Sequence, residues 1–117
     1  MGEPIDGQIT LLTAAKSSVP PSQLPDLIER AQRHLEPELE TYRRTAECVF
    51  EDDDRAVFLL EAGFWRRVGA EVGFDDREWK AVRRAHTDQF RRVGRRTDRD
   101  EEFEVALEIR EPVCIGL

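Results

Sequence analysis

The sequence predicts a small, mainly α-helical bundle that forms a single domain over residues 1–117. Three observations support this class. Apolar residues recur at spacings of three and four along most of the chain, as the buried face of a helix requires. A chain of 117 residues that is 39% apolar and 37% charged suits one hydrophobic core. Only near residues 47–60 and 103–109 does the pattern also fit strands.

The first helix is expected at the N-terminus. Asp6 can cap a helix that runs to about residue 19, because a short carboxylate accepts hydrogen bonds from the first free amides. Its spacing predicts that Ile9, Leu12 and Ala15 lie on the buried side. A Val-Pro-Pro-Ser sequence then breaks the chain before the second helix,.

A second apolar stripe begins near residue 24 and continues to residue 49. Pro37 interrupts this stripe, and a proline inside a helix lacks the backbone donor and clashes with the preceding turn. Two interpretations remain open: a kinked helix from residue 24 to about 48, or two helices with Pro37 opening the second. The apolar face before the proline is formed by Leu24, Leu27, Ile28, Ala31 and Leu35, and the face after it by Leu39, Tyr42, Ala46 and Val49.

Residues 47–61 fit either a β-hairpin or a helix. A hairpin near 47–60 would join two apolar segments through the acidic turn 51–54,, although no Asn-Gly or Asp-Gly pair supplies the preferred tight turn. A helix would use Asp53 or Asp54 as its cap and would place Val57, Leu60 and Phe64 on one stripe,. We favour the hairpin.

Two helices and a mixed tail are expected in the second half of the chain. A helix over residues 64–72 precedes a longer one over 76–95, which Asp75 or Asp76 caps, and Gly94 weakens near its end. In the tail, Thr97 and the acidic residues after it favour a helix to about residue 110, with residues 113–115 extended,. The alternation over 103–109 favours a strand instead. The buried face of the long helix is predicted at Trp79, Val82, His86, Phe90 and Val93.

Metal-ligating and catalytic residue types are scarce. Cys48 and Cys114 are far apart and form no C-x-x-C motif, so we expect two free thiols and no metal site. His86 lies on the predicted apolar stripe, where a hydrogen-bonded core imidazole is expected rather than a general base. No glycine-rich loop matches a phosphate-binding motif,. We therefore expect no enzymatic activity and no cofactor.

Targeting signals are also missing from the sequence. No apolar run approaches the ~20 residues of a membrane span, and the N-terminus lacks the basic start and apolar core of a signal peptide,. These features predict a cytoplasmic protein without a membrane partner. The 16 arginines and 2 lysines set against 25 acidic residues resemble the usage of salt-adapted haloarchaeal proteins, and a GC-rich genome would produce the same bias.

Charge is distributed unevenly along this acidic chain, whose net charge is −7. Residues 77–99 contain nine basic and three acidic side chains, a net charge of +6, whereas residues 1–76 carry −8 and residues 100–117 carry −5. The total charge argues against a polyanionic partner, but the local charge permits one.

Within and beside this basic segment, residues 66–85 resemble the helix-turn-helix family of DNA-binding segments. That family needs a small residue where the first helix faces the second, and a glycine at the turn. Gly69 and Gly73 stand at these two positions. Trp79 departs from the pattern, because its large ring stands where a β-branched residue is usual. The remaining apolar positions are filled by Val68, Val72, Phe74 and Val82.

The resemblance implies a recognition helix over residues 76–85 and duplex DNA as the partner. Arginine forks bond both acceptors of a guanine edge, whereas Asp75 and Asp76 would repel the polyanion. The base-contacting side chains would be Arg77, Lys80, Arg83 and Arg84, and the phosphate-contacting ones Arg91, Arg92, Arg95 and Arg96,. The alternative is a protein-interaction or assembly module without nucleic acid. Its acidic and basic regions would join copies of the chain or dock on an acidic protein.

Overall fold

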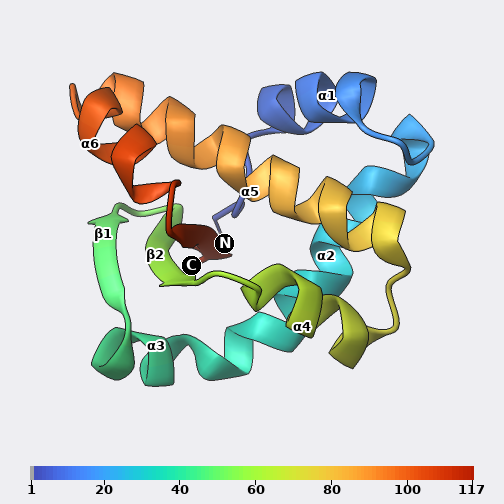
Figure 1. Cartoon of the computed structure of the whole chain (residues 1–117), viewed down its shortest axis with the longest axis horizontal. Helices are drawn as coiled ribbons and strands as arrows, with labels where there is room; N and C mark the ends of the chain where they lie inside the picture. Colours follow the sequence, from blue (N-terminus) through green and yellow to red (C-terminus); the bar gives the residue numbers. More distant parts are fainter. Residues whose placement is uncertain (1) are drawn as a thin grey trace.

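A three-stranded antiparallel sheet, in the order β1-β2-β3, lies among the helices of the computed structural model, which describes residues 2–117 (Figure 1). Strands β1 (Glu47–Glu51) and β2 (Arg55–Glu61) form a hairpin, and β3 (Arg110–Gly116) pairs with the whole of β2 from the other side. The predicted mostly helical fold with a hairpin is confirmed. It is corrected from a helical bundle to an α/β domain, because the extended segment after α6 pairs with β2 as a third strand, which was not predicted.

Between residues 2 and 117 the structure has six α-helices. The longest, α5, crosses the molecule diagonally and contacts α1, α2, α4, α6 and β3 (Figure 1). The helices are α1 (Gly7–Lys16), α2 (Leu24–Leu35), α3 (Leu39–Thr45), α4 (Phe64–Val72), α5 (Asp76–Arg96) and α6 (Asp100–Ala106), with 3-10 turns at Pro21–Gln23 and Glu36–Glu38.

The two-helix interpretation of residues 24–48 is correct. Pro37 lies in the 3-10 turn between α2 and α3, where its missing amide donor costs no α-helical hydrogen bond,. All five predicted apolar positions of α2 are buried.

The predicted buried side of α1 is wrong in part. The helix ends at Lys16, it buries Ile9, Thr13 and Ala14, and it leaves Leu12 and Ala15 exposed. A polar contact explains this orientation, because the Thr13 hydroxyl donates to Asp88 Oδ2 of α5 at 2.7 Å.

The hairpin prediction for residues 47–60 is confirmed. Asp52 Oδ1 accepts hydrogen bonds from the amides of Asp54 and Arg55, at 2.8 and 3.0 Å. This side chain stabilises the turn that a glycine pair would otherwise make.

The tail prediction is correct only for its first part. Helix α6 ends at Ala106 rather than near residue 110, and the segment after it joins the sheet as β3. The Thr97 hydroxyl does not cap α6, since it donates to the Val93 carbonyl at 2.8 Å. Pairing with β2 buries Val113, Cys114 and Ile115. A helix extended through these residues would not bury them in the sheet, which explains why the chain leaves the helical conformation after Ala106.

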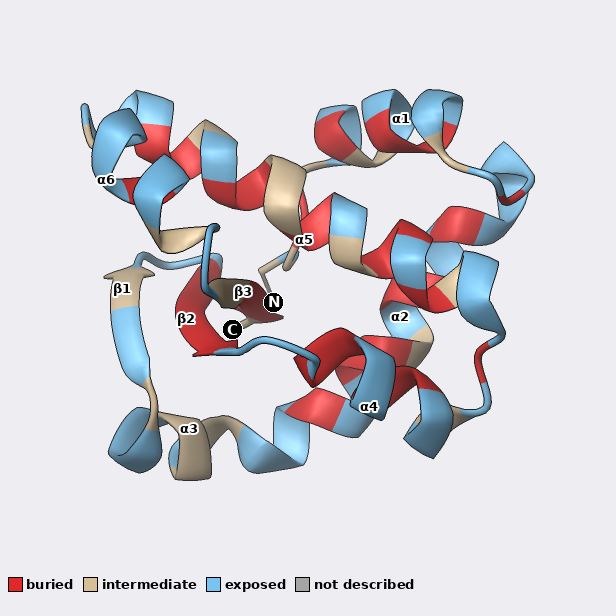
Figure 2. Ribbon diagram, viewed as in Figure 1, coloured by how far each residue is buried: buried red, intermediate tan, exposed pale blue. Residues whose placement is uncertain are grey.

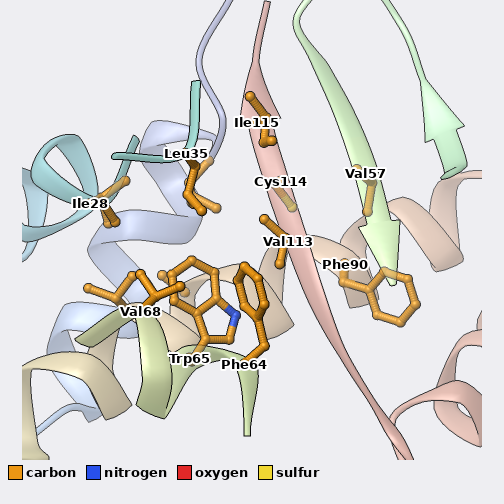
Figure 3. Close-up of a cluster of buried hydrophobic side chains, with 14 of the residues drawn as sticks. Ile28, Leu35, Val57, Phe64, Trp65, Val68, Phe90, Val113, Cys114 and Ile115 are labelled. Atoms are coloured by element: carbon orange, nitrogen blue, oxygen red, sulfur yellow. The ribbon is translucent and has the colours of Figure 1, made fainter. Parts of the chain in front are cut away.

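The core lies between the sheet and the inner faces of α2, α4 and α5 (Figure 2). Phe64 and Trp65 at the start of α4 pack beside β3, together with Val68 and with Leu35 of α2 (Figure 3). The rings of Phe64 and Trp65 meet edge-to-face, with their centroids 5.4 Å apart.

Side chains close the outer edge of β3. The indole Nε1 of Trp65 donates to the Pro112 carbonyl at 3.0 Å, and the Cys114 amide donates to His86 Nδ1 at 2.9 Å. Gln32 completes the edge, because its amide donates to the Cys114 carbonyl at 2.7 Å and accepts from the Gly116 amide at 3.1 Å. Three helices thus replace a fourth strand.

Candidate nucleic-acid interface

Helices α4 and α5 are joined by a short turn that contains Gly73. Helix α4 ends at Gly73, which adopts a left-handed conformation with φ of +83°, a region that favours glycine. The Phe74 amide then donates to the Gly69 carbonyl at 2.8 Å and closes the turn,. α5 begins at Asp76, three residues after Gly73.

Gly69 explains how the pair accommodates Trp79. A Cβ atom built on Gly69 would lie 2.6 Å from Trp79 Cβ, so that only glycine lets the two helices approach this closely. The small residue that the sequence pattern places at the crossing therefore offsets the large ring opposite it. The helices need not be forced apart.

The acidic residues at the start of α5 are engaged within the fold. Asp75 Oδ1 accepts from the Glu78 amide at 2.9 Å, and Glu78 Oε1 accepts from the Asp75 amide at 2.8 Å, which makes a capping box,. Asp76 Oδ1 accepts from the Trp79 indole at 3.1 Å. These carboxylates stabilise the helix start and the position of the Trp79 ring.

The predicted basic residues divide into two groups along α5. In the first half, no carboxylate pairs with any of four cations within the part of the chain that the structure describes. We call these four residues the basic face. They are Arg77, Lys80, Arg83 and Arg84, of which only Arg83 is partly buried.

Most arginines of the second half are paired. Arg91 Nε lies 2.7 Å from Glu104 of α6, and Arg92 and Arg96 lie 3.4 and 3.7 Å from Asp6. Arg95 is exposed and has no such pair with residues 2–117. The expected phosphate contacts of the second half would thus compete with pairs already made inside the molecule.

Two aromatic contacts order the basic face. The Arg83 guanidinium lies 5.0 Å and the Lys80 ammonium 5.6 Å from the centroid of the Trp79 ring, within the range of cation–π attraction. Arg84 Nη1 donates to the Lys16 carbonyl at the end of α1, at 3.4 Å. The side chains are thereby held near one place on the surface.

A hollow of about 520 Å³ adjoins the basic face, between the first half of α5 and the end of α1. Its lining includes the whole basic face, Lys16, Ser17 and Ser18. Of its two carboxylates, Asp76 accepts from Trp79, and Asp88 accepts from Thr13 and pairs with Lys16 at 3.5 Å. Cations therefore dominate the hollow, which suits a phosphate or another anion.

The histidine in the core, the two cysteines and the acidic side chains are the remaining candidates for catalysis or metal binding. Burial lowers the pKa of His86 to about 3, so the ring is neutral near pH 7 and sits in the core, as predicted. Cys48 and Cys114 are free thiols, as predicted, and burial raises the pKa of Cys114 to about 12. Residues 2–117 contain no group of three His, Cys, Asp or Glu side chains placed to hold a metal. No helix in the described chain is long and apolar enough to cross a bilayer.

The sequence did not reveal which carboxylates would pair with the arginines of α5. Asp6 and Glu104 have this role, and Asp6 is about 90 positions away from its partners. The only local signal was the capping position of Asp6, and its carboxylate makes no cap hydrogen bond.

Comparisons with other proteins give a family and no activity. Neither the comparison with curated proteins nor the comparison with solved structures found a match. A scan against protein families matched residues 3–117, which is nearly the whole chain. The chain thus belongs to the family described as Domain of unknown function (DUF8048).

Proposed function

We propose that this protein binds duplex nucleic acid through the basic face of α5. One observation carries the proposal: four cations without carboxylate partners gather at one place on a protein whose net charge is −7. Unpaired like charges repel one another, and a polyanion placed over them relieves that repulsion. Because the protein holds carboxylates in excess, the lack of an ion pair to any of these four cations within residues 2–117 favours an external partner.

The local geometry supports an α-helical contact. An α-helix fits the major groove of B-DNA, which is about 12 Å wide. Arg77, Lys80 and Arg84 are exposed on the first half of α5, and their spacing of three and four places them on one stripe of that helix. Trp79 restrains Arg83 beside them, which reduces the side-chain entropy lost on binding.

Duplex binding as a function of salt tests the proposal. A labelled 20-base-pair duplex is titrated with protein in 50–400 mM KCl, and fluorescence anisotropy reports the dissociation constant. If each of the four cations of the basic face neutralises one phosphate, the logarithm of affinity falls with the logarithm of salt concentration with a slope of about −3.6. Continuing the series to about 1 M KCl, where the Debye length is about 3 Å, separates screened phosphate contacts from base contacts.

A charge-reversal pair locates the binding face. The variant Arg83→Glu plus Arg84→Glu should bind at least ~10-fold more weakly in 100 mM KCl and show a slope shallower by about 2. The matched control, Arg33→Glu plus Arg44→Glu on α2 and α3, changes the net charge equally and should shift affinity by less than ~3-fold, the size of a long-range effect. Equal losses in the two variants, or no loss in the first, would refute the proposal.

A further inference from the structure

The hollow between α1 and α5 has two walls that are tied to each other. Lys16 at the end of α1 lies 3.5 Å from Asp88 of α5, and the Lys16 carbonyl accepts from Arg84 Nη1 at 3.4 Å. Asp88 also accepts from the hydroxyl of Thr13, a buried residue of α1, at 2.7 Å. These three contacts hold the walls in place without a ligand, which reduces the ordering cost of binding one.

The size and the charge of the hollow suit a small, multiply charged anion. Its volume of about 520 Å³ lies in the range of small-molecule sites, about 300–1,000 Å³. Its lining holds two acidic and six cationic side chains, a net charge of +4, and Glu104, which pairs with Arg91 from outside the lining, reduces this to +3. The six cations are the basic face, Lys16 and Arg91. A phosphate group carries about −1.5 to −2 near pH 7, so two such groups match this charge.

A small ligand and a duplex would use this surface differently. A duplex would lie along the exposed stripe of α5 that Arg77, Lys80 and Arg84 form,. A ligand inside the hollow would also reach Lys16 and Ser18 at the end of α1. Because both depend on the cations of the basic face, a ligand in the hollow would neutralise the charge that attracts the duplex.

We propose that this hollow binds a compact molecule with two neighbouring phosphate groups, and that the bound molecule excludes duplex nucleic acid from the basic face. The exclusion rests on the proposed function, whereas the diphosphate site depends only on the shape and the charge of the hollow. Duplex binding would thereby respond to the concentration of a small phosphorylated compound.

Calorimetric titration with inorganic diphosphate tests the site, in 100 mM KCl without divalent cations. We expect one diphosphate to bind per chain, with a dissociation constant at least ~10-fold lower than that of sulfate, because sulfate carries its two charges on a single centre and spans fewer cations. Equal affinity for the two anions, or no binding of diphosphate up to about 5 mM, would overturn the proposal.

A carboxylate introduced on the α1 wall locates the ligand. Ser18 is exposed, so Ser18→Glu should fold normally, and its charge would repel a phosphate in the hollow. We expect the affinity for diphosphate to fall at least ~10-fold and that for the duplex less than ~3-fold, since the duplex contacts α5. The control Arg44→Gln, on α3, lowers the net charge by the same one unit and should change both affinities less than ~2-fold. Equal losses of diphosphate affinity in the two variants would overturn the proposal.

A competition experiment distinguishes failure of this site from failure of the proposed function. Diphosphate added at constant ionic strength to the labelled duplex complex should release the duplex near its own dissociation constant, and sulfate should need at least ~10-fold more. Duplex binding without diphosphate binding would overturn the site alone, and a duplex that saturating diphosphate does not release would overturn the exclusion. Diphosphate binding by a protein that binds no duplex would support the site, and it would refute both the proposed function and the exclusion.

Discussion

His86 shows how one side chain completes a strand edge at the cost of its own second nitrogen. Its Nδ1 accepts from the Cys114 amide at 2.9 Å, which places the proton of the neutral ring on Nε2,. Nε2 is buried and has no hydrogen-bond partner within residues 2–117. The ring packs against Trp65, with centroids 4.3 Å apart, so a core role accounts for this histidine.

The lowered pKa of the buried His86 ring predicts how the stability of the fold depends on pH. The folded pKa of His86 is about 3, below the ordinary value of 6.5, so the unfolded chain binds a proton that the folded chain does not. The contribution of the neutral His86 ring to the free energy of unfolding is therefore fully present above about pH 6.5. It falls by up to about 1.4 kcal/mol per pH unit as the pH decreases toward 3. Urea unfolding at pH 7, 6, 5 and 4.5 measures this slope.

The variant His86→Asn serves as the control for this slope. Its amide oxygen can still accept from the Cys114 amide, but it does not titrate. The smaller side chain should lower stability at pH 7 by about 2–3 kcal/mol. Between pH 6 and 4.5 its stability should be almost constant, and a slope equal to that of the wild type would contradict the assignment.

The crossing of α4 and α5 depends on the absence of a side chain at Gly69. Substitution Gly69→Ala gains about 1 kcal/mol of helix propensity, but its Cβ would lie 2.6 Å from Trp79 Cβ. Because this contact is between two atoms close to the backbone, the helices must separate, and we expect a net loss of about 1–3 kcal/mol in the free energy of unfolding. Chemical denaturation measures the loss.

Gly7→Ala provides a matched comparison. Gly7 also lies in a helix, but a Cβ built there meets nothing within 4 Å. This change should be neutral or stabilise the protein by up to about 1 kcal/mol. If the two substitutions have the same effect, close packing is not the reason for glycine at position 69.

The two outer edges of the sheet are protected in different ways. Side chains of Gln32, Trp65 and His86 close the edge of β3. Strand β1 instead carries a register irregularity between Cys48 and Phe50, and Arg99 donates to the Val49 carbonyl at 2.7 Å. Bulges and charged side chains both discourage pairing with another chain, so β1 is a poor site for self-association.

At the scale of the whole molecule, Asp6 joins the N-terminal segment to the sheet and to α5. Its carboxylate lies 2.7 Å from Arg55 of β2 and 3.4 Å from Arg92, and it accepts from the amide of Gln89 at 3.3 Å. Burial alone would raise the pKa of Asp6, but the bond from Gln89 and the guanidinium of Arg55 hold it below 3.8. The pair therefore stabilises the fold above that pH and is lost as the pH falls through the lowered pKa.

Removing this carboxylate should affect the whole fold. Asp6→Asn keeps the shape but leaves the buried Arg55 guanidinium, 4% exposed, without its counter-charge. We expect a loss of about 3 kcal/mol in the free energy of unfolding. The control Glu104→Gln removes the exposed pair with Arg91 and should cost less than about 1 kcal/mol. Comparable costs in guanidinium denaturation would show that Asp6 is not a central link.

Short-range chemistry made much of this fold predictable. The Asp75 cap, the Gly73 turn, the apolar stripe of α2 and the hairpin at residues 47–61 all depend on residues within about a dozen positions of one another. The position of the basic segment on a helix followed from the same local patterns.

Contacts between distant residues could not be deduced in this way. The pairing of β3 with β2, the side chains that close its edge, and the orientation of α1 each join residues that are 28 or more positions apart, and no periodic pattern reports such a meeting. Contacts between distant residues also determine which arginines of α5 remain unpaired. Asp6 and Glu104 lie within ion-pair distance of three of them. The four cations of the basic face stay unpaired because no carboxylate of residues 2–117 lies within ion-pair distance of them. Charge order along the chain placed the arginines on one helix, but packing in three dimensions determined which of them remain available to a partner.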